Sequence, residues 1–407
     1  MSAPSPRRAF NAVRNLRLLG VLSVLYEFNP TIAIWVVYLT HYRDISLAQV
    51  GIMEGFFWLV KLALEVPSGA FADRYGRRAT ALIGVVIEGA GIIAFGLADG
   101  YVLLLGSYIL WSGGLAFRSG NHEAYLFDTL ATADRQAEYA QRHGAYRGMG
   151  HVAFATSGVL GGLVAAATTL QVGILVSGAS YVLSFVVLLT MQEPPRQAST
   201  AVPVVASHSY RGTLRVALAA LRADAALRWM LALEVVIMTS FPVHFVLAQP
   251  FLGEHGVPLA LYGVVDVPAR MLGALALVMS YRWGRGLGLA RALAVASALP
   301  VLGLVLLAGV DHVAAFAGFA LLQLGGGLAL PLMSAYVNER TDSSVRATIH
   351  SVAPLGSSLT YVAVTPLLGI AGDADLRLAF ALMAAGIGVS ALFAYTAWTK
   401  ADRVPVA

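Results

Sequence analysis

The chain has 407 residues, of which 58% are hydrophobic and 12% are charged, and its mean hydropathy is +0.73. A soluble domain has roughly a quarter of its residues charged, so this composition excludes an ordinary water-soluble fold. The chain has no cysteine, which excludes disulfides, thiolate catalysis and cysteine metal sites.

Apolar stretches follow one another along the chain, each close to the ~20 residues that cross a hydrocarbon core as a helix. Because lipid offers no partner to an open backbone amide, we expect every stretch to be helical. In chain order the predicted spans are 17–40, 48–71, 79–98, 101–126, 144–166, 169–191, 228–252, 258–281, 290–310, 312–337, 347–371 and 376–399. The sequence therefore predicts an all-α membrane protein with twelve transmembrane helices.

The distribution of basic residues predicts the orientation of these helices. With a cytoplasmic N-terminus, nearly all arginine and lysine residues lie in cytoplasmic segments, and the outer loops hold only Arg43 and Arg377. The positive-inside rule therefore predicts a multi-pass protein of the cytoplasmic membrane with both termini in the cytoplasm. Arginines at an anionic inner leaflet also account for the net charge of +5, so no nucleic-acid partner is expected.

The longest polar stretch, 192–227, contains Pro194-Pro195 and follows the sixth span. We expect it to be a cytoplasmic linker between an N-terminal six-helix bundle, 1–191, and a C-terminal one, 228–407. A faint repeat supports this division, because Asn29-Pro30 in the first span matches Phe241-Pro242 in the seventh. Two pseudo-symmetric six-helix bundles are a recurring transporter design.

Ionisable side chains within spans normally face a protein interior or a water-filled cavity. The candidates for substrate binding or proton coupling are Glu27, Glu54, Lys61, Arg118, Glu123 and Asp266. Two of them have a neighbour at helical i,i+4 spacing that can neutralise them: Lys61 with Glu65, and Asp266 with Arg270. We expect the second to be a structural pair. No role is predicted for Glu88, the one charge of an otherwise apolar span.

Glu27 is the strongest candidate for a proton carrier or a cation-binding group. It lies near the middle of the first span, beside the helix-breaking pair Asn29-Pro30. Loss of water around a lone carboxylate favours its neutral form, which suits either role. The alternative is a structural hydrogen bond to a neighbouring helix.

The loop between the second and third spans carries a motif. It is Gly69-Ala70-Phe71-Ala72-Asp73-Arg74-Tyr75-Gly76-Arg77-Arg78, which resembles the G-x-x-x-D-R-x-G-R-[RK] signature of the major facilitator superfamily. The resemblance implies a lock between two conformational states formed by Gly69, Asp73, Arg74, Gly76, Arg77, Arg78 and Asp128. In physical terms, Gly69 permits close helix approach, Gly76 permits a tight turn, and Asp73 can cap a helix or pair with an arginine.

A second segment runs from Ser119 to Leu130 and includes Glu123-Ala124 and Phe127-Asp128. It resembles a segment of bacterial drug-efflux members of that superfamily. The two resemblances imply a secondary transporter, not an enzyme, which exports a hydrophobic or cationic small molecule in exchange for protons. Two alternatives stay open: a proton symporter that imports a nutrient, and a membrane lipid-handling protein. No cofactor is expected beyond the proton gradient, and the expected partners are the substrate, protons and lipid, with the chain as a monomer.

Overall fold

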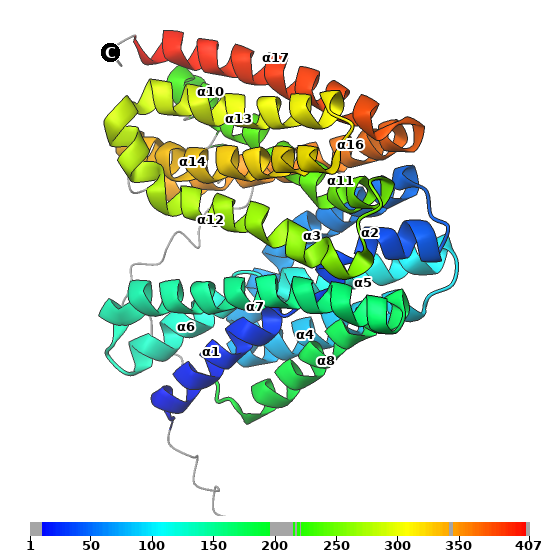
Figure 1. The fold of residues 1–407 in the computed structure, drawn as a ribbon. Helices are drawn as coiled ribbons and strands as arrows, with labels where there is room; N and C mark the ends of the chain where they lie inside the picture. The colour runs from blue at the N-terminus through cyan, green and yellow to red at the C-terminus, as the bar shows by residue number, and fades with distance from the viewer. Residues whose placement is uncertain (1–9, 196–214, 216–217, 220, 342–344, 404–407) are drawn as a thin grey trace, which may run out of the picture. The chain divides into compact units, whose positions relative to one another are not determined.

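The computed structural model describes residues 10–195, 215, 218–219, 221–341 and 345–403. Within them all regular secondary structure is helical (Figure 1). The chain divides into two compact units, unit 1 with residues 1–32 and 60–204, and unit 2 with residues 33–59 and 205–407. The predicted linker, 192–227, lies largely outside the described residues, so the predicted division into two bundles joined by this linker stays a prediction.

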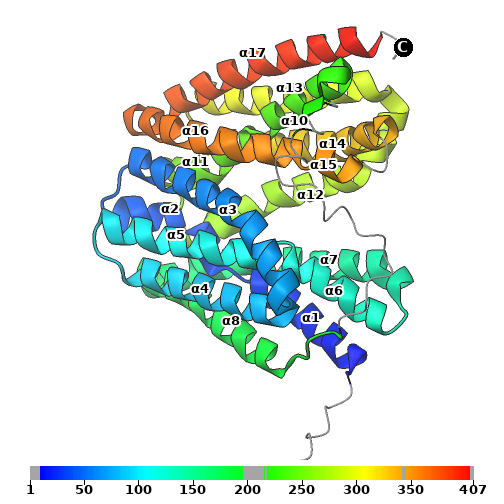
Figure 2. The same ribbon diagram turned by 180° about the vertical axis from the view of Figure 1, so that it is seen from behind.

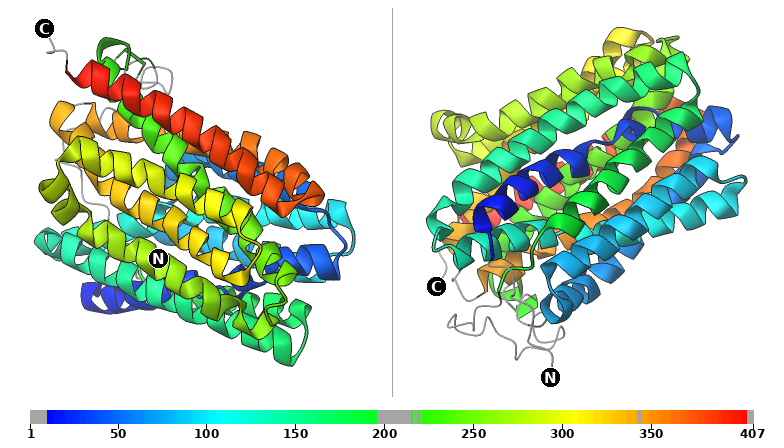
Figure 3. Two further views of the ribbon diagram at one scale, coloured as in Figure 1. Left: turned by 45° about the horizontal axis from the view of Figure 1, so that its top comes forward. Right: turned by 90° about the horizontal axis from the view of Figure 1, so that it is seen from below.

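Unit 1 holds the helices of the first six spans, apart from the segment 33–59. Its helices are α1 (Ala12–Glu27), α4 (Arg77–Leu97), α5 (Tyr101–Arg118), α6 (Asn121–Thr132), α7 (Tyr139–Ala167) and α8 (Leu170–Thr190). Helix α3 (Leu47–Tyr75) begins in unit 2 and ends in unit 1. Helix α1 packs against α7 and α8 and lies between them (Figure 3, right), while α4 lies along α5 (Figure 2).

Unit 2 holds the remaining helices. They are α2 (Trp35–Val37), α10 (Ala225–Met238), α11 (Ser240–Glu254), α12 (Tyr262–Leu287), α13 (Leu289–Gly309), α14 (Ala317–Arg340), α15 (Arg346–His350), α16 (Val352–Ala374) and α17 (Leu376–Asp402). Its core is formed by fully buried apolar side chains of α10, α13, α14 and α17, among them Leu233, Leu293, Met333 and Trp398. The segment 33–59 is tied to this unit, since Gln249 accepts the N–H of Val36 and Asp373 accepts that of Leu47.

The first helix ends where the sequence predicts a break. Helix α1 ends at Glu27, and the chain resumes as a 3-10 turn, Pro30–Ala33, before α2. Pro30 lacks a backbone N–H, and Ser157 on α7 accepts the N–H of Asn29 at 3.0 Å, so the freed backbone is satisfied by a neighbouring helix. The segments Ala12–Ala33 and Trp35–Tyr42 meet at an angle of 48° and together are long and apolar enough to form one span. Among the described residues, eleven other helical segments are long and apolar enough to cross a membrane. The predicted all-α membrane fold is confirmed.

The fourth span is not the continuous helix predicted over 101–126. Helix α5 ends at Arg118, and α6 begins at Asn121 and runs on to Thr132. Gly120 between them has a φ of +71°, in the left-handed region that ends a helix and favours glycine. The residues after the break therefore belong to a separate helix, which carries Glu123 and Asp128.

Candidate functional site

Unit 1 contains a polar cavity of about 300 Å³ between α1, α5, α6 and α7. Its charged and titratable lining residues are Glu27, Arg118, His122, Glu123, His143, Arg147 and His151, together with Tyr26 and Tyr146. Three of the predicted site residues, Glu27, Arg118 and Glu123, are thus brought together. The cavity is within the range of small-molecule sites, at its lower end.

Arg118 forms the best-defined ion pair at this cavity. Its Nε and Nη2 donate to the two carboxylate oxygens of Glu88 on α4, at 2.8 and 3.1 Å. Glu88 is 1% exposed and also accepts the Tyr181 hydroxyl at 3.0 Å. On its other side the guanidinium lies over the Tyr26 ring, with Cζ 4.7 Å from the ring centroid. Arg118 is therefore held between α1 and α4 at the end of α5.

The close approach of α4 and α5 places Glu88 within reach of Arg118. A Cβ at Gly114 on α5 would lie 2.3 Å from the backbone nitrogen of Glu88, which no side chain tolerates. Glycine at this position therefore sets the spacing of the two helices.

Glu27 is the last residue of α1 and lines the cavity. Its Cγ lies 2.9 Å from the point that a Cβ of Gly150 on α7 would occupy. It is close enough to attract the Arg118 guanidinium electrostatically, but among the described residues its carboxylate forms no hydrogen bond or ion pair. The predicted alternative, a structural hydrogen bond to a neighbouring helix, is not found.

The first turn of α6 presents two further titratable groups to the cavity. His122 shares a hydrogen bond of 2.9 Å with the hydroxyl of Ser23 on α1, and its ring packs edge-on against Tyr26. Glu123 faces His143 of α7, with 3.9 Å between carboxylate oxygen and Nε2. Both groups of this second pair are about one-third exposed, so the attraction is weak.

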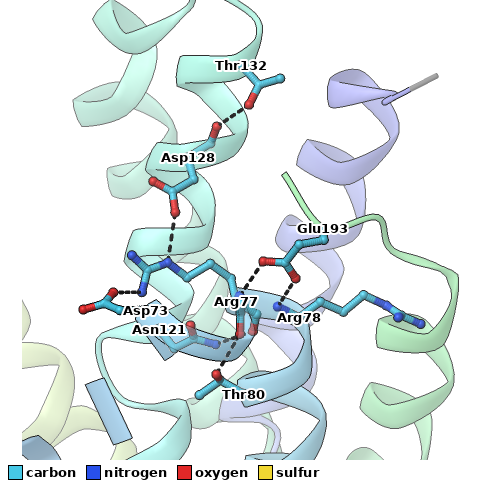
Figure 4. Close-up of polar contacts among 9 residues, drawn as sticks. Asp73, Arg77, Arg78, Thr80, Asn121, Asp128, Thr132 and Glu193 are labelled. Carbon is cyan, nitrogen blue, oxygen red and sulfur yellow. Dashed lines mark hydrogen bonds and ion pairs between the residues drawn. The ribbon is translucent and has the colours of Figure 1, made fainter. Parts of the chain in front are cut away.

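The motif of the loop between α3 and α4 forms a second cluster (Figure 4). Arg77 joins two carboxylates: its Nη1 lies 3.2 Å from Asp73 at the end of α3, and its Nε lies 2.9 Å from Asp128 on α6. Asn121 donates to the backbone oxygen of Arg77 at 2.8 Å. Of the two roles expected for Asp73, pairing with an arginine is the one observed.

A residue outside the motif caps α4. Glu193, beyond the end of α8, accepts the backbone N–H groups of Arg77 and Arg78 at 2.6 and 2.8 Å (Figure 4). A carboxylate suits this helix N-terminus because it satisfies two free donors and the positive end of the helix dipole. Gly76 allows it, with a φ of +102° and only 2.6 Å between the position of a Cβ and Glu193 Oε1.

Two further residues of the motif, Arg78 and Gly69, do not contact the carboxylates that Arg77 joins. Arg78 turns away and donates from Nε to the backbone oxygen of Leu188 on α8, at 2.8 Å. Gly69 is exposed, and a Cβ there would meet no described atom of unit 1 within 4 Å, so the close helix approach expected at Gly69 stays a prediction.

Glu54, Lys61 and Asp266 lie outside this cavity. Glu54 is buried in unit 2, where it accepts the indole N–H of Trp58 at 3.2 Å. Lys61 lies on the part of α3 that belongs to unit 1. Whether it is neutralised by Glu65 stays a prediction.

Asp266 forms the predicted pair with Arg270, one turn further along α12, with 2.5 Å between Oδ2 and Nε. Its other oxygen lies 2.6 Å from Nε2 of His244 on α11. The His244 ring is 2% exposed and packs against Phe319. The predicted ion pair is present, with His244 as an additional partner that connects two helices, and its structural role stays a prediction.

Sequence reasoning assigned no role to Glu88 and did not single out Tyr26, Glu193 or the histidines of the cavity as site residues. A lone carboxylate in an apolar span needs a cationic partner, and Arg118 was the unpaired arginine of the next span. That signal was sufficient to suggest the Glu88 pair. Glu193 carries no comparable signal, because it sits beside a proline-rich polar stretch.

The comparison with known families shows what the chain is related to. The model of the Major Facilitator Superfamily matches residues 17–365. Among curated proteins, the chain is 30% identical over 127 residues to an uncharacterized MFS-type transporter, YxaM, of Bacillus subtilis (strain 168), and 30% identical over 117 residues to the inner membrane transport protein YajR of Escherichia coli (strain K12). These matches cover 31% and 28% of this chain, and 29% and 24% of those relatives.

Solved structures show the same fold over nearly the whole chain. A mutant of the nucleoside transporter NupG has a TM-score of 0.79 at 12% identity, covering 95% of this chain and 100% of that one. A bacterial homolog of the human lysosomal transporter Spinster, inward-facing and unoccupied, has a TM-score of 0.78 at 16% identity, covering 97% and 99%. The family match spans most of the sequence, and the chain belongs to the major facilitator superfamily.

Proposed function

We propose that this chain is a proton-coupled secondary transporter that exports a hydrophobic or cationic small molecule, and that Glu27 carries the proton or the substrate charge. The single observation that supports this most is Glu27 itself, a carboxylate that lines a cavity with no hydrogen bond or ion pair among the described residues. Such a group exchanges a proton or a cation without first breaking a structural bond. Glu123, one helix away and weakly paired, is the second candidate.

The cluster around Arg77 is proposed as the conformational lock. Arg77 connects the ends of α3 and α6 through Asp73 and Asp128, and these carboxylates are 72% and 40% exposed. Exposed ion pairs contribute little to stability, so they can form and break as a protein changes state. Gly69, Arg74, Gly76 and Arg78 belong to this proposal through the motif.

The direction of transport and the orientation are proposals as well. Both termini are expected in the cytoplasm because basic residues concentrate on that side. A C-terminal reporter that is active only outside the cytoplasm should stay inactive, and a signal from it would contradict the orientation. Import of a nutrient with protons is the alternative function, and vesicles of known orientation separate export from import by the sign of the proton flux.

A substrate is first identified by growth of an efflux-deficient host that expresses the chain on a panel of toxic compounds. Inverted vesicles then report proton release through a pH-sensitive dye when that compound is added. Glu27→Gln keeps the size and hydrogen bonding of the side chain but cannot ionise, so we expect normal membrane insertion and no response to an imposed pH gradient. Glu254→Gln, at the end of α11, is the matched control and should respond normally. Retained pH-driven transport in Glu27→Gln would remove Glu27 from the mechanism.

A further inference from the structure

The Arg118 guanidinium has donors that the protein itself does not use. An arginine has five N–H donors in a fixed fork, and Glu88 takes two of them, one on Nε and one on Nη2. No other hydrogen bond to Arg118 exists among the described residues. Both donors of Nη1 and the second donor of Nη2 are therefore available.

These donors are held in place at the cavity. Glu88 fixes one edge of the guanidinium, and the Tyr26 ring covers one face. Tyr181 holds Glu88 in turn, at 3.0 Å. The Arg118 side chain is only 15% exposed, and it lines the cavity. A fixed guanidinium with free donors binds an oxygen acceptor with little loss of conformational entropy.

The same cavity offers a second, opposite group. Glu27 attracts Arg118 electrostatically, yet the two form no ion pair. The charge of Arg118 is already balanced by Glu88, so the carboxylate of Glu27 is left to attract a cation. An amine bound to Glu27 and an oxygen bound to Arg118 would satisfy both groups at once.

We propose that the cavity binds an amine that also carries an oxygen acceptor, with Glu27 on the amine, Arg118 on the oxygen, and Glu88 as the residue that positions Arg118. This rests on the proposed function, whose substrate class it narrows from hydrophobic or cationic molecules to two-group molecules. The cavity volume of about 300 Å³ accommodates a ligand of the size of a modified amino acid.

Binding to the purified full chain, measured by calorimetry without a pH gradient, tests this with three probes of similar size. Phenylalaninamide has the amine and the carbonyl, 2-phenylethylamine has the amine alone, and 3-phenylpropanamide has the carbonyl alone. We expect the wild type to bind phenylalaninamide about tenfold or more tightly than either other probe, since a hydrogen bond to a charged group supplies at least that ratio. Equal binding of the three probes, or no binding of phenylalaninamide at millimolar concentration, would overturn the proposal.

Variants test whether Arg118 recognises the carbonyl group and Glu27 the amine of phenylalaninamide. The double variant Glu88→Gln with Arg118→Gln removes both buried charges together, so no unpaired charge is left to unfold the protein. It should lose the preference for phenylalaninamide over 2-phenylethylamine, and Glu27→Gln should lose the preference over 3-phenylpropanamide. The double variant Asp266→Asn with Arg270→Gln removes an equivalent pair in unit 2 and should keep both preferences. Retention of both preferences in the Glu88/Arg118 variant would contradict the role of Arg118.

The two proposals fail separately. Selective binding of phenylalaninamide without any pH-driven transport would leave the cavity assignment standing and reject proton coupling. Proton-driven transport by a chain that binds the three probes equally would support proton coupling and reject the cavity assignment.

Discussion

Each unit contains a carboxylate–arginine pair within its spans, and the two pairs are built differently. Glu88 and Arg118 in unit 1 come from neighbouring helices, 30 residues apart, and meet only because α4 and α5 pack closely. Asp266 and Arg270 in unit 2 are one turn apart on the same helix. The pair within one helix follows from local geometry, whereas the pair between helices depends on the fold.

The environments of the two pairs differ as well. Glu88 is 1% exposed and its partner lies over an aromatic ring at a cavity, while Asp266 and Arg270 are each roughly one-fifth exposed and Asp266 also contacts His244. Loss of the arginine therefore leaves a more deeply buried charge in unit 1 than in unit 2. The pair of unit 1 lies at a cavity, whereas the pair of unit 2, together with His244, joins α11 to α12.

The largest expected effect comes from breaking the pair of unit 1. Arg118→Ala leaves Glu88, which is 1% exposed, without its cation and should lower the free energy of unfolding by roughly 3–5 kcal/mol. Arg270→Ala leaves Asp266, which is 17% exposed and keeps its contact with His244, and its cost should be about 1–3 kcal/mol. Thermal unfolding in detergent, followed by tryptophan fluorescence, compares the two. Equal losses of unfolding free energy in the two variants would show that the burial of the remaining charge does not determine the cost.

For the exposed ion pairs of Arg77, we expect a small effect of mutation on stability and a larger effect on transport. Asp73→Asn removes one of the two carboxylates on Arg77, and because these pairs are solvent-exposed, its effect on stability should be below about 1 kcal/mol. Transport should fall by up to about fivefold if the pair sets the balance between two states, because an exposed pair can shift that balance by no more than its own contribution of about 1 kcal/mol. Asp134→Asn, in the loop after α6, is the matched control. Normal transport by Asp73→Asn with normal expression would reject the lock.

The helices α4 and α13 allow a third comparison between the units. Each begins directly after a glycine with positive φ, Gly76 and Gly288, but only α4 has its first N–H groups capped by a side chain, that of Glu193. Glu193→Ala should cost about 1 kcal/mol at this helix end, as other lost caps do. Hydrogen exchange at Arg77 and Arg78 should then accelerate about fivefold, with the first turn of α13 unchanged. Unaltered exchange at both amides would show that the cap adds no protection.

A smaller effect than that of breaking the ion pair is expected from Tyr181→Phe, which removes one hydrogen bond to Glu88 and leaves its pair with Arg118 intact. We expect a loss of about 0.5–1.5 kcal/mol in the free energy of unfolding, the usual contribution of one hydrogen bond. Tyr395→Phe, whose hydroxyl donates to Ala290 at an exposed site in unit 2, is the matched control and should cost less. A loss in Tyr181→Phe as large as that of Arg118→Ala would mean that Arg118 is not the main partner of Glu88.

The sequence alone determined the features that depend on local chemistry. Long apolar stretches must be helical in lipid, which predicted the spans and the fold class. Pro30 broke the first span where it was expected, because proline lacks an N–H in every fold. The pair of Asp266 and Arg270 followed from a spacing of four residues on one helix.

Tertiary packing decided which charges meet. Three features join segments that are distant in sequence: the pair of Glu88 and Arg118, the cavity lined by Glu27 and Glu123, and the cap by Glu193. No local sequence pattern predicts such contacts. The sequence also did not predict the break at Gly120. A lone glycine in an apolar stretch is compatible with a continuous helix. Helices form from local bonds, but the partner of a buried charge is chosen by whichever helix packs against it.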